Sequence, residues 1–223
     1  MKITKYAQSC LLVETKDKRI LIDPGVLKFQ DSLLENDWIN INAVLITHQH
    51  QDHCMDDAVN HIIKDSGAKL YSSKEVANTH PDIKPEIVKE GDIIEVGEVK
   101  VEVVHAVHGY FPALKERGII VNENIGYIID DGAIRFYHTS DCIAFDNDYK
   151  TDVIAVPINN HGVCFDPFSA AQFSKETKAN LVIPMHYDNP ALPGDLDKTE
   201  EEFKKAELNY KILGIGESVE INE

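Results

Sequence analysis

The chain alternates between two kinds of segment, and this alternation limits the folds that it can adopt. Residues 2–25 and 91–138 contain short apolar runs separated by tight turns, which is typical of β-hairpins. Residues 42–72 and 152–186 instead place continuous apolar runs beside stretches of helical spacing. The same order of segments occurs twice. It predicts one α/β domain over residues 1–223, a four-layer αββα sandwich of two mixed sheets with helices on the outside.

Turn and helix signals predict the individual elements. Residues 2–15 and 19–25 flank a turn and predict a hairpin. Asp131 and Gly132 predict a tight primed turn between two further strands. Helices are expected at three places, and a loop at one. The helices are residues 55–65, a segment that begins at Asp166 and Pro167, and residues 197–208, and the loop is residues 109–119.

The charge of the chain narrows the classes of partner. A formal net charge of -16 disfavours nucleic acids and anionic membrane surfaces, although a metal site could still attract a small anionic substrate. No apolar run approaches the roughly 20 residues of a membrane span, and no signal peptide is evident. The four cysteines are far apart and predict reduced thiols. We therefore expect a cytoplasmic protein without a membrane or nucleic-acid partner, and the sequence leaves a homo-oligomer open.

One short stretch concentrates metal-binding side chains. The sequence THQHQDHC, residues 47–54, follows an apolar run and contains His48, His50, Asp52 and His53. Side chains two positions apart point to the same side of an extended chain, so His48 and His50 can reach one metal ion. Asp52 and His53 lie where the chain bends towards a helix, and they are better placed for a second ion. Histidine nitrogen together with carboxylate oxygen suits zinc, and also iron or manganese.

Other metal-binding side chains follow later apolar runs. Asp141 and His186 each come at the end of a predicted strand, as His108 does beside Gly109. Ligands at strand ends are held rigidly, as a catalytic metal requires. His105 competes with His108 for this position. An odd separation turns the two side chains to opposite faces of a strand, and we favour His108 because it ends the strand.

These motifs resemble those of a known family. Residues 48–53 match the HxHxDH motif of the metallo-β-lactamase-fold hydrolases, and the resemblance covers nearly the whole chain. His108, Asp141 and His186 match the later single-residue motifs of that family in order and spacing. The stretch IPMHY, residues 183–187, which carries the last of these motifs, is similar to that of a small branch related to the ascorbate-6-phosphate lactonases. Ser140 stands where the family usually has glycine, so the turn before Asp141 is less free.

The resemblance implies a centre of two divalent metal ions, in the first place zinc, that share a hydroxide. The implied ligands are His48, His50 and His108 for one ion, Asp52, His53 and His186 for the other, and Asp141 as a bridge. Asp52 would also act in catalysis by orienting the hydroxide.

Polar residues outside this set are candidates for supporting roles. His161 and Asn160 follow an apolar run, and we expect them to contact the substrate. Asn159 and Asn160 could donate hydrogen bonds to an oxyanion. His138 is placed to orient a ligand through a hydrogen bond. Residues 110–117, with two aromatic and two basic side chains, predict either a flap that contacts the substrate or an ordinary solvated connector.

Together these observations predict a metal-dependent hydrolase that acts on a small-molecule ester, lactone or phosphoester. One alternative is a nuclease of the same fold, which the acidic charge disfavours. Another is an iron-binding redox protein without hydrolytic activity. A binding module that has lost its metal is disfavoured because every implied ligand is present.

Overall fold

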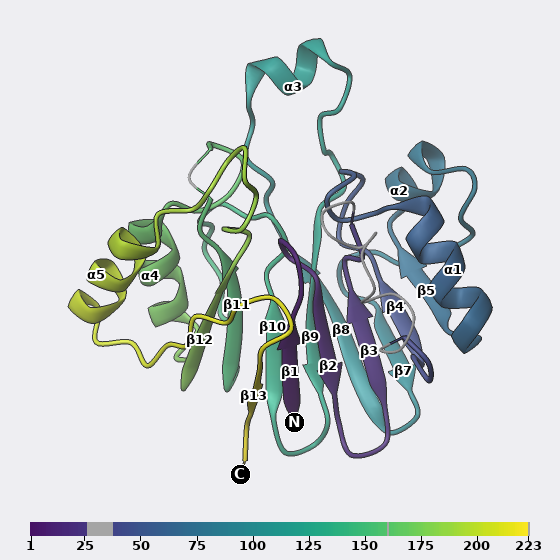
Figure 1. Cartoon of the computed structure of the whole chain (residues 1–223), viewed down its shortest axis with the longest axis horizontal. Helices are drawn as coiled ribbons and strands as arrows, with labels where there is room; N and C mark the ends of the chain where they lie inside the picture. Colours follow the sequence, from purple (N-terminus) through teal and green to yellow (C-terminus); the bar gives the residue numbers. More distant parts are fainter. Residues whose placement is uncertain (26–37, 160, 223) are drawn as a thin grey trace.

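A computed structural model describes residues 1–25, 38–159 and 161–222, whose strands form two sheets that face each other (Figure 1). The first sheet contains β1 (Lys2–Lys5), β2 (Leu11–Glu14), β3 (Arg19–Ile22), β4 (Ala43–Leu45), β5 (Lys69–Ser72), β6 (Glu86–Ile87) and β13 (Ser218–Glu220), in the spatial order β13-β1-β2-β3-β4-β5-β6. The second contains β7 (Ile93–Val96), β8 (Val99–His105), β9 (Ile125–Asp130), β10 (Arg135–His138), β11 (Val153–Pro157) and β12 (Leu181–Met185), in the order β12-β11-β10-β9-β8-β7. Both sheets are mixed, because β3 and β10 each pair with one antiparallel and one parallel neighbour.

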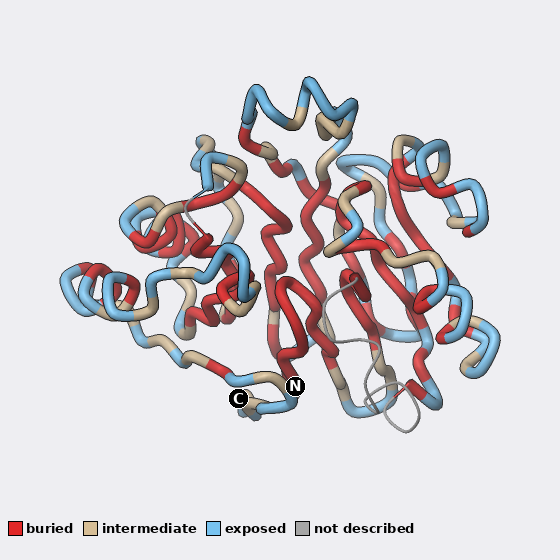
Figure 2. Tube along the Cα trace, turned by 45° about the horizontal axis from the view of Figure 1, so that its top comes forward, coloured by how far each residue is buried: buried red, intermediate tan, exposed pale blue. Residues whose placement is uncertain are grey.

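Helices cover the outer faces of both sheets. α1 (Asp56–Ser66) and α2 (Lys74–Thr79) lie beside the first sheet, whereas α4 (Pro167–Glu176) and α5 (Leu196–Lys205) lie beside the second (Figure 1). A short helix, α3 (Pro112–Glu116), stands apart from these layers on a largely exposed arm (Figure 2). The predicted αββα sandwich is confirmed.

Side chains that alternate along the strands fill the apolar layers. In β3, Ile20 and Ile22 pack between the sheets, while Leu21 packs towards α1. β9 repeats this pattern, with Ile129 between the sheets and Ile128 on the side of α4 and α5. Successive side chains leave a strand on opposite faces, so both faces of each sheet are buried. Truncating one such side chain to alanine costs about 2–5 kcal/mol of stability.

The predicted helices are present, and their ends have local causes. α1 matches the predicted residues 55–65 to within one position and ends at Gly67, whose φ of 70° suits glycine. Asp166 caps α4 by accepting a hydrogen bond from the Ser169 backbone N–H, and Pro167 opens that helix. Within the described ranges, no helix combines the length and apolarity that a membrane crossing needs.

Local details differ from the predictions in three places. Residues 2–15 form two antiparallel strands, β1 and β2, because the chain reverses near Gln8, where φ is 56°. β2 then forms the expected hairpin with β3. The β9–β10 connection spans residues 131–134 and has positive φ only at Gly132, so it is not a two-residue primed turn. Residues 109–119 contain α3 and are not entirely a loop.

Candidate metal centre

Strand ends from both sheets bring metal-binding side chains to one edge of the molecule. The chain carries His48 after β4, His108 after β8, Asp141 after β10 and His186 after β12. The prediction that His108 ends its strand was wrong, because β8 ends at His105. His105 is half-exposed and contacts Glu90 through Nδ1 at 2.9 Å. His108 lies beyond the strand and joins the other histidines, whereas His105 does not.

Three imidazoles form a first group of donor atoms. One ring nitrogen from each of His48, His50 and His108 lies within 4.8 Å of the other two. Burial lowers the pKa of His108 to about 4. Burial, together with His53 nearby, also lowers the pKa of His48 well below its usual value. Both rings are therefore neutral at pH 7, which leaves their lone pairs available to a metal ion.

Backbone carbonyls decide which ring nitrogens face this group. His50 Nε2 donates to Ile119 O at 2.9 Å, and His108 Nδ1 donates to Gly109 O at 2.8 Å. The opposite nitrogens, His50 Nδ1 and His108 Nε2, are left as acceptors. Metal-binding histidines usually make such a second hydrogen bond, because it sets the orientation and the tautomer of the ring.

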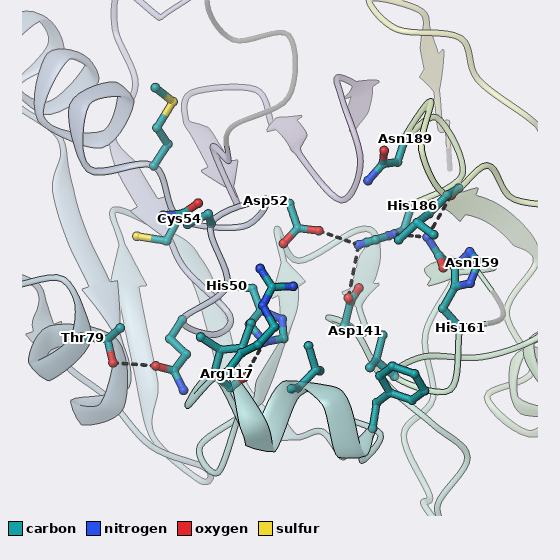
Figure 3. A pocket seen from close by; sticks show the side chains of 18 of the residues that line it. His50, Asp52, Cys54, Thr79, Arg117, Asp141, Asn159, His161, His186 and Asn189 are labelled. Carbon is teal, nitrogen blue, oxygen red and sulfur yellow. Dashed lines mark hydrogen bonds and ion pairs between the residues drawn. The ribbon is translucent and has the colours of Figure 1, made fainter.

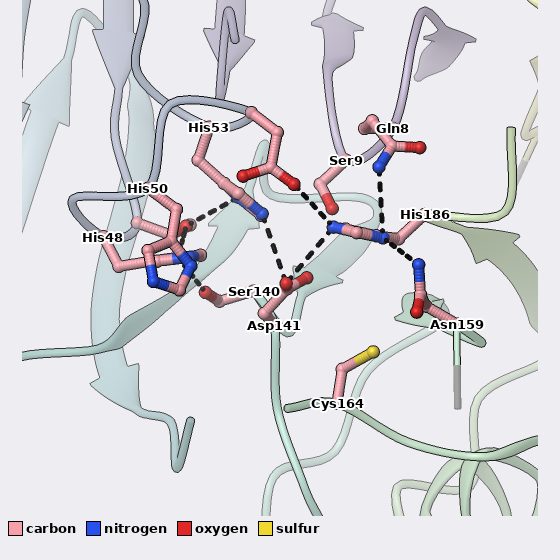
Figure 4. A network of polar contacts seen from close by, with 12 residues as sticks. Gln8, Ser9, His48, His50, His53, Ser140, Asp141, Asn159, Cys164 and His186 are labelled. Atoms are coloured by element: carbon pink, nitrogen blue, oxygen red, sulfur yellow. Dashed lines mark hydrogen bonds and ion pairs between the residues drawn. The ribbon is translucent and has the colours of Figure 1, made fainter. Parts of the chain in front are cut away.

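A second group combines carboxylates with imidazoles. Donor atoms within 4.8 Å of one another come from Asp52, His53 and His186. Asp141 Oδ2 lies 3.4 Å from His53 Nε2 and 3.2 Å from His186 Nε2 (Figure 4). A further set within 4.8 Å joins Asp141 and His53 to His48 of the first group. Asp141 therefore lies between the two groups.

The electrostatics of this second group favour positive charge. Burial alone would raise the pKa of Asp141, but His186 and His53 lower it well below its usual value. Burial alone would lower the pKa of His186, but Asp141 and Asp52 raise it to about 10. In the metal-free chain, protons on the imidazoles balance the carboxylates. A divalent cation at this position would displace those protons.

Buried atoms without hydrogen-bond partners show that the residues fit a metal ion. Several buried side-chain atoms of the described residues make no hydrogen bond, and three of them, His53 Nε2, His108 Nε2 and Asp141 Oδ1, belong to the two donor groups. Of these three, His53 Nε2 has one longer contact, with Asp141 Oδ2 at 3.4 Å. Each unsatisfied buried polar atom costs about 1–3 kcal/mol. These three atoms belong to the two donor groups, so cations bound there would satisfy all of them.

Asp23 supports this centre, although the sequence marked it only as part of a turn. It directly follows β3, and its buried carboxylate accepts hydrogen bonds from the Thr47 backbone N–H at 2.8 Å and from Thr47 Oγ1 at 2.7 Å. It also contacts His53 Nδ1 at 2.7 Å, which turns His53 Nε2 towards Asp141. An acid directly after an apolar strand was the signal that could have identified it.

Comparison with known proteins places the chain in a family. The sequence model of the beta-lactamase superfamily domain matches residues 2–186. A UPF0173 metal-dependent hydrolase of Thermococcus onnurineus is 31% identical over 219 residues, which covers 92% of each chain. The chain belongs to this superfamily and to its UPF0173 metal-dependent hydrolases.

Solved structures share the fold of this metal-dependent hydrolase. Igni18, a metallo hydrolase of Ignicoccus hospitalis, has a TM-score of 0.78 at 24% identity and covers 98% of this chain and 97% of its own. The metallo-beta-lactamase fold protein YhfI of Bacillus subtilis has a TM-score of 0.76 at 16% identity and covers 98% of this chain and 99% of its own. The predicted superfamily is confirmed, whereas the narrower likeness to ascorbate-6-phosphate lactonases stays a prediction.

Two amides lie behind His186 in this hydrolase. His186 Nδ1 is 3.1 Å from Asn159 Nδ2 and 3.4 Å from Gln8 Nε2 (Figure 4). The amide oxygens of both residues are buried without partners. Rotating an amide by 180° exchanges its oxygen and nitrogen, so either oxygen can accept the Nδ1 proton and leave Nε2 free to face the carboxylates. Asn159, which we expected beside an oxyanion, therefore contacts His186. Gln8 carried no signal in the sequence.

Ser140 occupies a backbone conformation that favours glycine. Its φ is 64°, a region that costs a residue with a side chain about 1–2 kcal/mol. Its Oγ donates to Asn124 Oδ1 at 2.6 Å and lies 3.4 Å from His48 Nδ1. Its backbone N–H donates to His138 Nδ1 at 3.2 Å. These bonds offset the strain and fix the turn before Asp141, so His138 orients this turn and does not contact a ligand ring.

A pocket of about 1190 Å³ gives access to the metal centre (Figure 3). Of the residues that supply the donor atoms, His50, Asp52, Asp141 and His186 line it. His161 is exposed and also lines it, so its position allows the predicted contact with a substrate. Asn160, the other predicted substrate contact, lies outside the described residues.

Proposed function

We propose that this metal-dependent hydrolase uses two divalent metal ions to cleave a small ester, lactone or phosphoester. Zinc is the first candidate for these ions. The observation that carries the proposal is that three buried atoms able to bind a metal ion, His53 Nε2, His108 Nε2 and Asp141 Oδ1, make no hydrogen bond within one cluster of imidazoles and carboxylates. Iron and manganese suit the same donor atoms, so the metal that binds is a point for experiment.

The geometry supports a division of the ligands between two ions. The first ion would be bound by His48, His50 and His108, the second by Asp52, His53 and His186, with Asp141 as the bridge. This division follows the sets of donor atoms that lie within 4.8 Å of one another. Asp141 suits the bridge because its carboxylate is ionised and contacts His53 and His186.

Ions bound there would supply hydroxide at neutral pH and polarise the bond that is cleaved. Asp52 would orient the attacking oxygen, because its side chain is 30% exposed and lines the pocket beside His186. The buried neighbours of the centre keep the imidazoles in place, which limits reorganisation during the reaction. His161 would contact the substrate from the pocket wall.

A panel of neutral and anionic substrates tests this proposal. The purified protein would be reconstituted separately with zinc, manganese and iron, then assayed on nitrophenyl esters, simple lactones and nitrophenyl phosphates. We expect hydrolysis of at least one class, its loss on chelation and its return with metal. His108→Ala should lower kcat/KM by more than about 100-fold, whereas His105→Ala should change it little. Hydrolysis that survives chelation, or none with full metal loading, would contradict the proposal.

A further inference from the structure

We propose that Arg117 binds an oxyanion of the substrate, a carboxylate or a phosphate that is separate from the cleaved bond. The substrate would then be a small amphiphile with one anionic end. This inference rests on the proposed function, because it assumes that the pocket beside the metal centre receives the substrate. The sequence treated Lys115 and Arg117 alike, and the structure separates them.

Arg117 is fixed close to the metal centre by its own chain. Two residues beyond it, Ile119 O accepts the hydrogen bond from His50 Nε2 at 2.9 Å. The next carbonyl, of Ile120, accepts a hydrogen bond from Gln49 Nε2 at 2.6 Å. On the other side, the Arg117 backbone N–H bonds to Ala113 O and closes the end of α3. The position of Arg117 is therefore tied to a proposed metal ligand and not only to a loop.

The charge of the pocket makes Arg117 distinctive. Among the described residues that line the pocket, Arg117 is the only lysine or arginine. The acidic residues of the lining are Asp52, Asp56, Asp57 and Asp141. Within the part of the chain that the structure describes, no ion pair or hydrogen bond occupies the Arg117 guanidinium. All of its N–H groups are thus free to bind a carboxylate or phosphate, and its planar fork suits two-point binding of either.

The same arm supplies an apolar surface. Phe111, Leu114 and Ile119 line the pocket together with Arg117, and Val163 and Leu192 also belong to the lining. Phe111 is 46% exposed, which leaves it free to contact an apolar group. A ligand that joins an apolar body to one oxyanion matches this lining. Lys115 is exposed and does not line the pocket, although it lies on α3, whose C-cap residue is Arg117.

A matched pair of esters tests the inference on activity. Mono(4-nitrophenyl) glutarate and 4-nitrophenyl butyrate share a leaving group, but only the glutarate ester ends in a carboxylate. Arg117→Ala should lower kcat/KM for the glutarate ester by about 10- to 100-fold, the effect of losing a charge-assisted hydrogen bond. For the butyrate ester, the kcat/KM of Arg117→Ala should stay within about 3-fold of the wild-type value. Lys115→Ala should leave both esters unchanged, and Arg117→Lys should restore part of the loss. Equal losses on both esters in Arg117→Ala would overturn the inference.

Equilibrium binding separates this inference from the proposed function. Titration calorimetry on the metal-loaded protein would use 4-phenylbutyrate, 3-phenylpropyl phosphate and neutral 4-phenyl-1-butanol. Arg117→Ala should raise the Kd of at least one of the two anions by about 10-fold or more relative to wild type. The anion whose binding is weakened more shows whether Arg117 binds a carboxylate or a phosphate. Lys115→Ala should weaken neither. Unchanged binding of both anions in Arg117→Ala would overturn the inference. If wild type cleaves no ester but binds an anion through Arg117, the proposed bond class fails and the inference stands.

Discussion

At the scale of single residues, one carboxylate determines how a proposed metal ligand is oriented. Asp23 contacts His53 and Thr47 through three short interactions, all inside the buried edge of the first sheet. Fixing Nδ1 of His53 leaves Nε2 directed at Asp141. In metal sites, such outer partners set the ring orientation and raise the basicity of the ligand.

Asp23→Asn tests this role while it conserves shape. We expect affinity for zinc to fall by about 10- to 100-fold, because the amide holds the His53 proton less well than the carboxylate does. Competition with a chromogenic chelator measures the affinity. Asp17→Asn, at an exposed position in the turn before β3, is the control and should bind as wild type does. Equal zinc affinity in the two variants would show that Asp23 supports only the fold.

At the scale of elements, His80 joins two helices to the loop that carries the metal-binding motif. It follows α2 as the C-cap residue, and its Nδ1 contacts Asp56, the first residue of α1. Its Nε2 donates to the Gln49 backbone carbonyl at 2.8 Å. His80 is only 7% exposed and Gln49 is also buried, so the Gln49 carbonyl would have no ready replacement for this bond, whereas the Asp56 carboxylate is 28% exposed and can bind water.

His80→Ala should therefore lower the free energy of unfolding by about 1–3 kcal/mol, the cost of leaving a buried polar group unpaired. A chain of this length loses about 2–4 °C in Tm for each kcal/mol. Urea denaturation measures the change. His61→Ala is the matched control, because His61 is exposed on α1 and, among the described residues, pairs only with Asp65. It should change stability by less than about 0.5 kcal/mol. Similar values for the two variants would contradict this account of His80.

At the scale of the whole molecule, the two sheets supply the strand ends between which the donor groups form. The repeated order of hairpins and strand–helix units predicted this architecture. The histidines at strand ends indicated the edge of the sheets at which the donor groups form. Contacts between residues that lie far apart in the sequence could not be predicted. Asp23 reaches Thr47 because β3 and β4 pair in parallel with Ile22 opposite Leu45. Residues 109–119 predicted a loop because proline and glycine interrupt them, although α3 begins at Pro112 and ends before Gly118.

Because both sheets contribute donor atoms, metal binding should stabilise the molecule as a whole. A ligand that binds only the native state adds about 4 kcal/mol at a thousandfold excess over its Kd. Chelation should therefore lower Tm, and added zinc should restore it. His105→Ala should respond as wild type does, whereas His108→Ala should respond less. A Tm that is insensitive to chelator in the wild type would contradict this expectation.

The central claim, two ions held by two groups that share Asp141, is tested most directly by elemental analysis of the metal-loaded protein. We predict about two ions per chain in wild type and in His105→Ala, and about one in His108→Ala and in His186→Ala. A wild-type content of one ion or fewer, or a His108→Ala content equal to that of wild type, would contradict the account.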